Sequence, residues 1–315
     1  MNKKNAAYLF PGQGAQFSGM ATDLLSSASV KSLFDTASEI FGQDVKELLQ
    51  SDADTLKRTD VAQPAITAAD LAAAAFLGEQ GYTPAACGGF SLGEYAALVC
   101  AGIISAADCF RLVKARGEAM QKACDKLRGA NGDGPGMAAV VGLAPEQVDE
   151  LIAKWKKEGL KDLFAANINS PKQLVVSGTA ASLTEAETRF KEAGAKRVIR
   201  LQVAGPFHSP LMADAVDAFV PALEKVTFRD PSIAVFSNVT GKKISSGAEA
   251  KKLAVQQITC PVRWVEEQAS IAALGMEACL EVGPGKVLQG LWKDSGSQIP
   301  VFAAGTEEDI NKIGA

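Results

Sequence analysis

The segment from Gly88 to Tyr95, GGFSLGEY, constrains the fold of this chain more than any other stretch. A short apolar run, Pro84 to Cys87, precedes it, and a second apolar run starts at Tyr95, so the order is strand, sharp turn, helix. This is the setting of a nucleophile elbow, in which glycines on both sides of a serine allow a tight turn that exposes the serine hydroxyl. Taken alone, the segment is also compatible with an ordinary glycine-serine turn that caps a helix.

The histidine count limits how Ser91 can be activated. A serine needs a general base to act as a nucleophile at neutral pH, and the chain holds one histidine, His208. It lies in the segment GPFHSPLM, Gly205 to Met212, between an apolar run and an amphipathic helix. The Gly-Pro and Ser-Pro pairs stiffen this loop, which suits a positioned base, although a lone histidine is also common as a plain surface or core residue.

Composition indicates a soluble globular protein. The 315 residues are 47% hydrophobic and 22% charged, and the net charge of −4 gives no basic signature, so nucleic acid is a poor candidate partner. The six cysteines form no CxxC pair and have no histidine at metal-ligand spacing, so we expect no metal site and a reducing compartment. The first apolar run is too short for a signal peptide and no run reaches eighteen residues, so we expect no membrane contact and a cytoplasmic location.

A glycine-rich turn, Pro11 to Gln16, follows the first predicted strand. It lacks the GxGxxG spacing and the Lys-Ser/Thr pair of a phosphate-binding loop, which disfavours a nucleotide site. We expect instead that its backbone N–H groups and the Gln13 amide closely approach a ligand.

Strands and helices alternate on both sides of the elbow, which predicts an α/β core with a mainly parallel sheet. The segment from Gly129 to Gly136 has the composition of a linker. After it, the predicted strands and helices follow the order βαββαβ, which is the ferredoxin-like unit. We therefore predict a core of residues 1–136 and 204–315 with a ferredoxin-like subdomain, 137–203, inserted in it. Strands are predicted at 6–10, 84–87, 137–141, 164–168, 173–177, 197–201, 233–236, 278–282 and 301–303, and helices near 19–49, 59–77, 106–128, 145–157, 181–193, 210–223, 249–257, 262–274 and after 286.

A series of short motifs, in order along nearly the whole chain, resembles the malonyl-CoA:acyl-carrier-protein transacylase family, which is related to the acyltransferase domains of fatty-acid and polyketide synthases. The resemblance implies an α/β-hydrolase-like core with an inserted ferredoxin-like subdomain, in agreement with the pattern above. The motifs are FPGQGAQ from Phe10, QPA from Gln63, GFSLGEY from Gly89, RG at Arg116, NSP from Asn169, FHSPLM from Phe207, CPVRW from Cys260 and EVGPGK from Glu281.

The resemblance also implies the reaction. A malonyl group would pass from coenzyme A to Ser91 as an ester and then to the phosphopantetheine thiol of holo acyl carrier protein, supplying fatty-acid synthesis. By motif position, His208 would be the base and later the acid. The backbone N–H groups of Gln13 and Leu92 would form the oxyanion hole, and the backbone carbonyl near Gln257 would orient the imidazole. Beyond the coenzyme A thioester, no cofactor and no metal are implied, and the family is usually monomeric.

Four positions bear on acyl selectivity. By resemblance, Arg116 would bind the malonyl carboxylate, for which a bidentate guanidinium is suited; the alternative is a structural salt bridge. Phe90 departs from the family, which most often has histidine immediately before the nucleophile, and this leaves the acyl preference open. Leu92 and Phe207 fit the malonyl-using pattern better than the methylmalonyl one.

Acyl carrier protein is acidic, so a local basic patch is expected despite the net charge. The candidates are Lys196 and Arg197 with Arg200, or Lys242 and Lys243 with Lys251 and Lys252. Two other functions share the same sequence features: a serine hydrolase or thioesterase, with water as the acceptor, and a non-catalytic module that binds a carrier protein.

Overall fold

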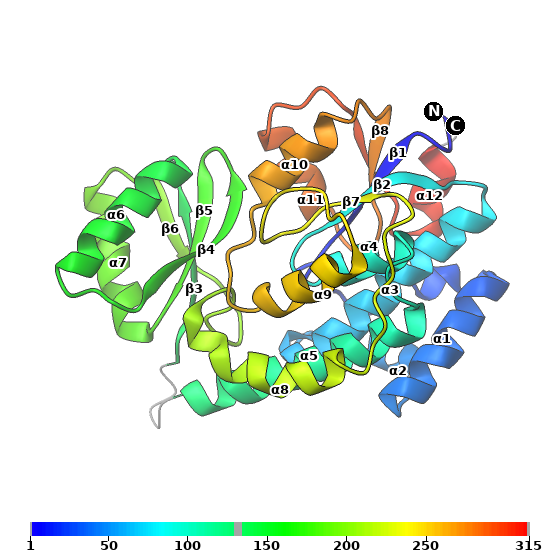
Figure 1. Cartoon of the computed structure of the whole chain (residues 1–315), viewed down its shortest axis with the longest axis horizontal. Coiled ribbons are helices and arrows are strands. Elements are labelled where there is room, and N and C mark those ends of the chain that lie inside the picture. The colour runs from blue at the N-terminus through cyan, green and yellow to red at the C-terminus, as the bar shows by residue number, and fades with distance from the viewer. Residues whose placement is uncertain (1, 129–133, 314–315) are drawn as a thin grey trace.

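The computed structural model describes residues 2–128 and 134–313. Its two β-sheets lie well apart in the molecule (Figure 1), the smaller one at the left in green and the larger one among the helices at the right. The N- and C-termini lie close together beside the larger sheet (Figure 1).

The larger sheet has five strands in the order β7-β2-β1-β8-β9, and every pairing in it is parallel. The central strand β1 is buried along its whole length, as expected where both faces of a parallel sheet are covered. The predicted α/β fold with a mainly parallel sheet is therefore confirmed. The strands are β1 Ala6–Phe10, β2 Pro84–Gly89, β7 Ala234–Val235, β8 Ala278–Glu281 and β9 Val301–Ala303.

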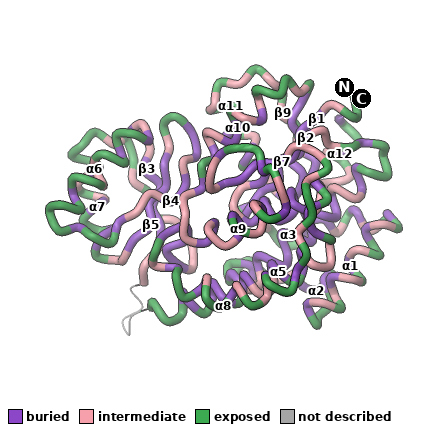
Figure 2. Tube along the Cα trace, in the orientation of Figure 1, coloured by how far each residue is buried: buried purple, intermediate pink, exposed green. Residues whose placement is uncertain are grey.

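Helices cover this sheet, and the alanine-rich α3, Thr59–Glu79, lies deepest among them. Figure 2 shows buried residues concentrated where α3 meets the strands. Its small side chains let it pack closely against α1 and α5. By length and composition α3 is apolar enough to cross a membrane, but 78% of its most apolar stretch is buried in the fold. The other helices of this part are α1 Ala28–Phe41, α2 Val45–Leu49, α4 Gly93–Cys100, α5 Ala106–Leu127, α8 Ala213–Leu223, α9 Gly247–Gln256, α10 Trp264–Ala272, α11 Val287–Asp294 and α12 Glu307–Ile313, with short 3₁₀ turns at Thr22–Ser26, Thr55–Lys57 and Pro210–Met212.

The smaller sheet is antiparallel, with the strand order β4-β5-β3-β6. Its elements follow the chain as β3 Gly136–Val141, α6 Pro145–Lys157, β4 Leu163–Ser170, β5 Gln173–Gly178, α7 Ala180–Glu192 and β6 Arg197–Arg200. The predicted βαββαβ unit is therefore confirmed. It has a hydrophobic core of its own, in which Trp155 and Phe190 pack edge to face.

The domain boundaries after residues 136 and 203 stay a prediction, because most of the predicted linker, residues 129–133, lies outside the described residues. The smaller sheet is joined by main chain to the segment before α10: Ile168 of β4 donates to the Val262 carbonyl, and Val262 donates to the Ala166 carbonyl.

Two helix predictions need correction, and one helix was not predicted. The helical region predicted at 19–49 is divided into a 3₁₀ turn, α1 and α2, because Gly42 adopts a left-handed φ of 73° and the Asp44 side chain caps α2. The helix predicted from Val262 begins at Trp264, since Val262 pairs with β4 instead. A further helix, α12, follows the last strand; it buries Ile310 and Ile313.

Candidate active site

The elbow between β2 and α4 has the predicted strand-turn-helix form, with Ser91 at a left-handed φ of 51°. The flanking glycines are sterically required. A Cβ on Gly89 would lie 2.1 Å from the Gly93 carbonyl carbon, and a Cβ on Gly93 would lie 2.1 Å from the Phe10 carbonyl oxygen. No side chain caps the start of α4, which disfavours the simple capping turn.

Ser91 and His208 meet although 117 residues separate them. The Ser91 Oγ lies 2.7 Å from His208 Nε2, and His208 Nδ1 lies 2.8 Å from the main-chain oxygen of Gln257. Because a carbonyl oxygen only accepts, Nδ1 carries the proton and Nε2 is left to accept from the serine hydroxyl.

The loop around His208 is held by hydrogen bonds to its carbonyl groups. The Ser177 hydroxyl donates to the Phe207 carbonyl at 2.5 Å, and the Ser209 hydroxyl donates to the Pro206 carbonyl at 2.6 Å. His208 itself has a φ of 56°, so His208, like Ser91, has a left-handed backbone. Burial, assisted by the positive charge of Arg116, lowers the pKa of His208 from 6.5 to about 4. The imidazole is therefore neutral at pH 7, as a general base must be.

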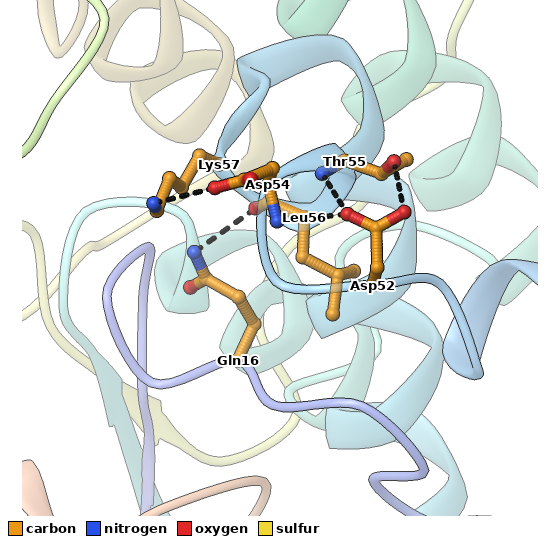
Figure 3. A network of polar contacts seen from close by, with 6 residues as sticks. All are labelled: Gln16, Asp52, Asp54, Thr55, Leu56 and Lys57. Carbon is orange, nitrogen blue, oxygen red and sulfur yellow. Dashed lines mark hydrogen bonds and ion pairs between the residues drawn. The ribbon is translucent and has the colours of Figure 1, made fainter.

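The loop from Pro11 to Gln16 closes over the elbow. A Cβ on Gly12 would lie 2.3 Å from the Phe90 carbonyl oxygen and 3.6 Å from the Leu92 nitrogen. Gln16 holds this loop in place: its side chain accepts from the Gly14 N–H at 2.7 Å. The same side chain donates to the Leu56 carbonyl at 3.1 Å (Figure 3). Gln13 and Leu92, the predicted oxyanion-hole residues, both line the cavity beside Ser91.

A cavity of about 430 Å³ lies above the elbow, and both parts of the fold line it. Ser91, His208 and Arg116 all contribute to its wall. Much of the remaining lining is apolar, from Met120, Met137, Val175, Leu201, Val203 and Phe207. Three amide side chains for which the sequence predicted no role, Asn167, Asn169 and Gln173, also line it.

Arg116 extends from α5 and is 1% exposed. Its Nη2 donates to the Gln257 side-chain oxygen at 3.0 Å, its guanidinium carbon lies 5.5 Å from the centre of the Tyr95 ring, and its Nε is buried without a partner. In the part of the chain that the structure describes, Arg116 forms no ion pair, so the structural salt bridge considered above is absent. A buried cation of this kind favours an anionic ligand group.

Phe90 lies at the cavity wall, and its ring packs edge to face against Trp264 with the ring centres 5.5 Å apart. The residue before Ser91 is thus held by an apolar contact.

Three polar residues for which the sequence predicted no role, Glu94, Asn238 and Glu267, lie beneath the elbow. Each is at most 2% exposed. Asn238 and Glu267 contact the elbow across 147 and 178 residues of sequence, a separation that no local pattern reveals.

Within residues 2–128 and 134–313, no group of three or more His, Cys, Asp or Glu side chains is placed to hold a metal ion. The six cysteines are all free thiols, and Cys87, Cys109, Cys124 and Cys279 are buried.

Residues 7–311 match the model of the acyl transferase domain family. The chain is 39% identical over 306 residues to the malonyl CoA-acyl carrier protein transacylase of Bacillus subtilis strain 168, covering 96% of this chain and 94% of that protein. It superposes on an acyl carrier protein S-malonyltransferase of Vibrio cholerae with a TM-score of 0.89 and 36% identity, over 98% of this chain and all of the other. A malonyl-transacylase solved in complex with its type II PKS acyl-carrier protein gives a TM-score of 0.89 at 34% identity, over 98% of both chains.

Proposed function

This chain belongs to the acyl transferase domain family, among the malonyl CoA-acyl carrier protein transacylases, and on that premise we propose that it transfers a malonyl group from coenzyme A to the phosphopantetheine thiol of holo acyl carrier protein. It is an acyltransferase. The observation that carries the mechanism is the 2.7 Å contact of Ser91 Oγ with His208 Nε2 in the wall of a cavity that also holds Arg116. The product would supply fatty-acid synthesis.

In the first half-reaction, Ser91 Oγ attacks the thioester carbonyl carbon while His208 Nε2 takes the hydroxyl proton. The backbone N–H groups of Gln13 and Leu92 donate to the oxyanion; each such donor contributes about 100-fold or more to the rate. The carbon–sulfur bond then breaks, and the imidazolium returns its proton to the departing coenzyme A thiolate. Ser91 is left as the malonyl ester.

The second half-reaction repeats these steps with a new nucleophile. His208 takes the proton of the carrier thiol, the thiolate attacks the ester carbonyl, and the Ser91 oxygen leaves with that proton. One thioester is exchanged for another, so the reaction is close to isoenergetic and needs neither nucleotide nor metal. The carbonyl of Gln257 orients His208 where a triad carboxylate would otherwise lie.

Arg116 supplies the selectivity in this proposal. Its unpartnered Nε and its burial favour pairing with the carboxylate of a malonyl group, and two parallel N–H bonds fit that planar anion. An acetyl group would leave the cation unpaired, which discriminates by up to about 10⁴-fold where a site is built for a polar group.

The remaining proposals concern the whole chain. We propose that residues 1–136 and 204–315 form the catalytic core, that 137–203 form the inserted subdomain, and that the protein is a cytoplasmic monomer without a resident cofactor. It is not expected to bind nucleic acid or membranes.

Intact-protein mass spectrometry tests the function. Wild type mixed briefly with malonyl-CoA should gain one malonyl group, Ser91→Ala should gain none, and addition of holo acyl carrier protein should move the group to the carrier. An adduct that decays equally fast without the carrier would indicate a hydrolase or thioesterase. Transfer that persists in Ser91→Ala would point to a non-catalytic carrier-binding role for this site.

A further inference from the structure

Asn238 spans the underside of the elbow. Its side-chain Oδ1 accepts from the Ser91 N–H at 2.7 Å, and its Nδ2 donates to the Gly89 carbonyl at 2.7 Å. One amide thus bonds to the residues on both sides of Phe90. The side chain is 0% exposed and comes from the loop that follows β7.

The partners of Asn238 fix which way its amide faces. The Ser91 N–H only donates and the Gly89 carbonyl only accepts, so Oδ1 must face Ser91 and Nδ2 must face Gly89. Glu267, from α10, supports the same orientation: its Oε2 accepts from Asn238 Nδ2 at 2.7 Å, and its Oε1 accepts from the Gly89 N–H at 3.1 Å. Glu267 is also 0% exposed.

The contact between Glu267 and the strand requires a glycine at position 88. A Cβ on Gly88 would lie 2.6 Å from Glu267 Oε1, so the carboxylate reaches the strand only because residue 88 is glycine. The bonds from Asn238 and Glu267 act on the two residues, Gly89 and Ser91, between which the chain turns. The φ of 51° at Ser91 is a conformation that a non-glycine residue keeps only when its surroundings impose it.

We propose that Asn238 and Glu267 are positioning residues for the nucleophile: the Asn238 amide, oriented by Glu267, holds the Ser91 backbone so that its Oγ reaches His208 Nε2. Neither side chain lines the cavity, so they act through Ser91 and not on the acyl group. The inference rests on the proposed function, under which Ser91 is the nucleophile.

Two readouts separate this role from a merely structural one. The first is the rate of malonyl-enzyme formation per folded molecule, measured as a function of malonyl-CoA concentration so that kcat and KM are obtained separately. The second is labelling of Ser91 by phenylmethylsulfonyl fluoride, which forms a sulfonyl ester with loss of fluoride and needs no malonyl recognition. Misplacing a nucleophile by about 1 Å costs on the order of 100-fold in rate, so Asn238→Ala should lower both rates by about 100-fold while KM for malonyl-CoA changes less than about threefold.

The decisive variant exchanges the amide and the carboxylate between positions 238 and 267. It also tests the proposal if Asn238→Ala does not fold. Glu267→Gln alone places two amide NH₂ groups against each other, so neither accepts. Asn238→Asp alone places two carboxylates against each other, so neither donates. In the double variant Asn238→Asp/Glu267→Gln, a protonated carboxyl group at position 238 accepts from the Ser91 N–H and from the new amide NH₂, and its O–H donates to the Gly89 carbonyl; the oxygen of the new amide accepts from the Gly89 N–H. The double variant should therefore react at least about tenfold faster than either single variant.

Phe34→Leu, in the buried core of α1 and outside the cavity, is the matched control for stability, and it should keep both rates per folded molecule. Wild-type rates in Asn238→Ala, a loss confined to KM, or a double variant no faster than the single variants would each overturn the inference. A wild type that takes the sulfonyl group at Ser91 but no malonyl group would overturn only the proposed substrate. A wild type that reacts with neither would overturn both proposals.

Discussion

Arg116 and His208 contact the same residue, Gln257, through different atoms. The Arg116 Nη2 donates to the Gln257 side-chain oxygen at 3.0 Å, and the His208 Nδ1 lies 2.8 Å from the Gln257 main-chain oxygen. The Gln257 Nε2 also donates to the Ser91 carbonyl at 2.9 Å and to Glu94 Oε2 at 2.8 Å. The charge of Arg116 in the cavity wall is thereby placed close to the His208 imidazole.

The reactivity of Ser91 should persist to an unusually low pH. Burial first, and the Arg116 charge second, hold the pKa of His208 near 4, so the neutral base is lost only as the pH falls through about 4 and not through 6.5. Removing the charge in Arg116→Ala should raise this pKa, so the rate should fall at a higher pH than in wild type. Phenylmethylsulfonyl fluoride labelling between pH 3.5 and 8 measures this without malonyl binding; coincident profiles for the two proteins would contradict it.

Arg116 should decide between acyl groups. With Arg116→Ala we expect malonyl transfer to fall by about 10³-fold or more while acetyl transfer from acetyl-CoA holds or rises, because only the malonyl carboxylate loses its partner. Arg116→Lys should be intermediate, since a lysine cannot form two parallel bonds. Steady-state kinetics with both donors check this, and equal loss of both activities would remove Arg116 from the role.

Glu94 should make stability depend on pH. Burial raises the pKa of Glu94 from 4.5 to about 7, against the hydrogen bonds from Asn238 and Gln257 that lower it. The folded state therefore keeps a proton that the unfolded state releases between pH 4.5 and 7, and the stabilising contribution, complete below 4.5, is lost as the pH rises through about 7.

In Glu94→Gln this dependence should disappear. The free energy of unfolding of the variant, relative to wild type, should grow by about 3 kcal/mol from pH 4.5 to 8, from a shift of about 2.5 pKa units. Because His208 is present in both proteins, its opposite dependence between pH 4 and 6.5 cancels in the difference. Urea unfolding at a series of pH values measures it, and a constant difference would show that Glu94 ionises normally in the folded protein.

Sequence alone predicted the parts of the site that have local causes. The elbow around Ser91 depends on glycines within two residues of it, and His208 follows from being the one histidine. The alternation of strands and helices predicted both sheets, because strand and helix periods are properties of short segments. The roles of Gln257 and Arg116 came only from family resemblance.

The rest of the site and of the fold depends on contacts between segments that are distant in the sequence. Asn238 and Glu267 reach the elbow only after β7 and α10 have packed beside β2, and nothing in their own neighbourhoods marks them as polar core residues. The start of α10 was misplaced for the same reason, since Val262 pairs with β4 of the inserted unit. Patterns of hydrophobicity do not encode such long-range hydrogen bonds.

Acyl carrier protein should dock at one of the two groups of basic residues. Lys196, Arg197 and Arg200 are exposed at β6, and Arg200 borders a hollow with Leu201 and Val203, which also line the main cavity. In the other candidate group, Lys251 already pairs with Glu224 at 3.0 Å. We therefore expect the first group, through Arg200, to supply the positive charge nearest the cavity.

Reversing the three charges at β6 to glutamate should raise KM for acyl carrier protein about tenfold at low salt, with a smaller effect at 0.5 M salt, because the attraction between exposed charges is screened. Lys251→Glu/Lys252→Glu, the matched charge reversal at the other patch, should change KM less than about twofold. KM for malonyl-CoA, measured in parallel, separates carrier docking from donor binding. An unchanged carrier KM in both variants would mean that neither patch docks the carrier, and a larger effect at Lys251 and Lys252 would move the docking surface to α9.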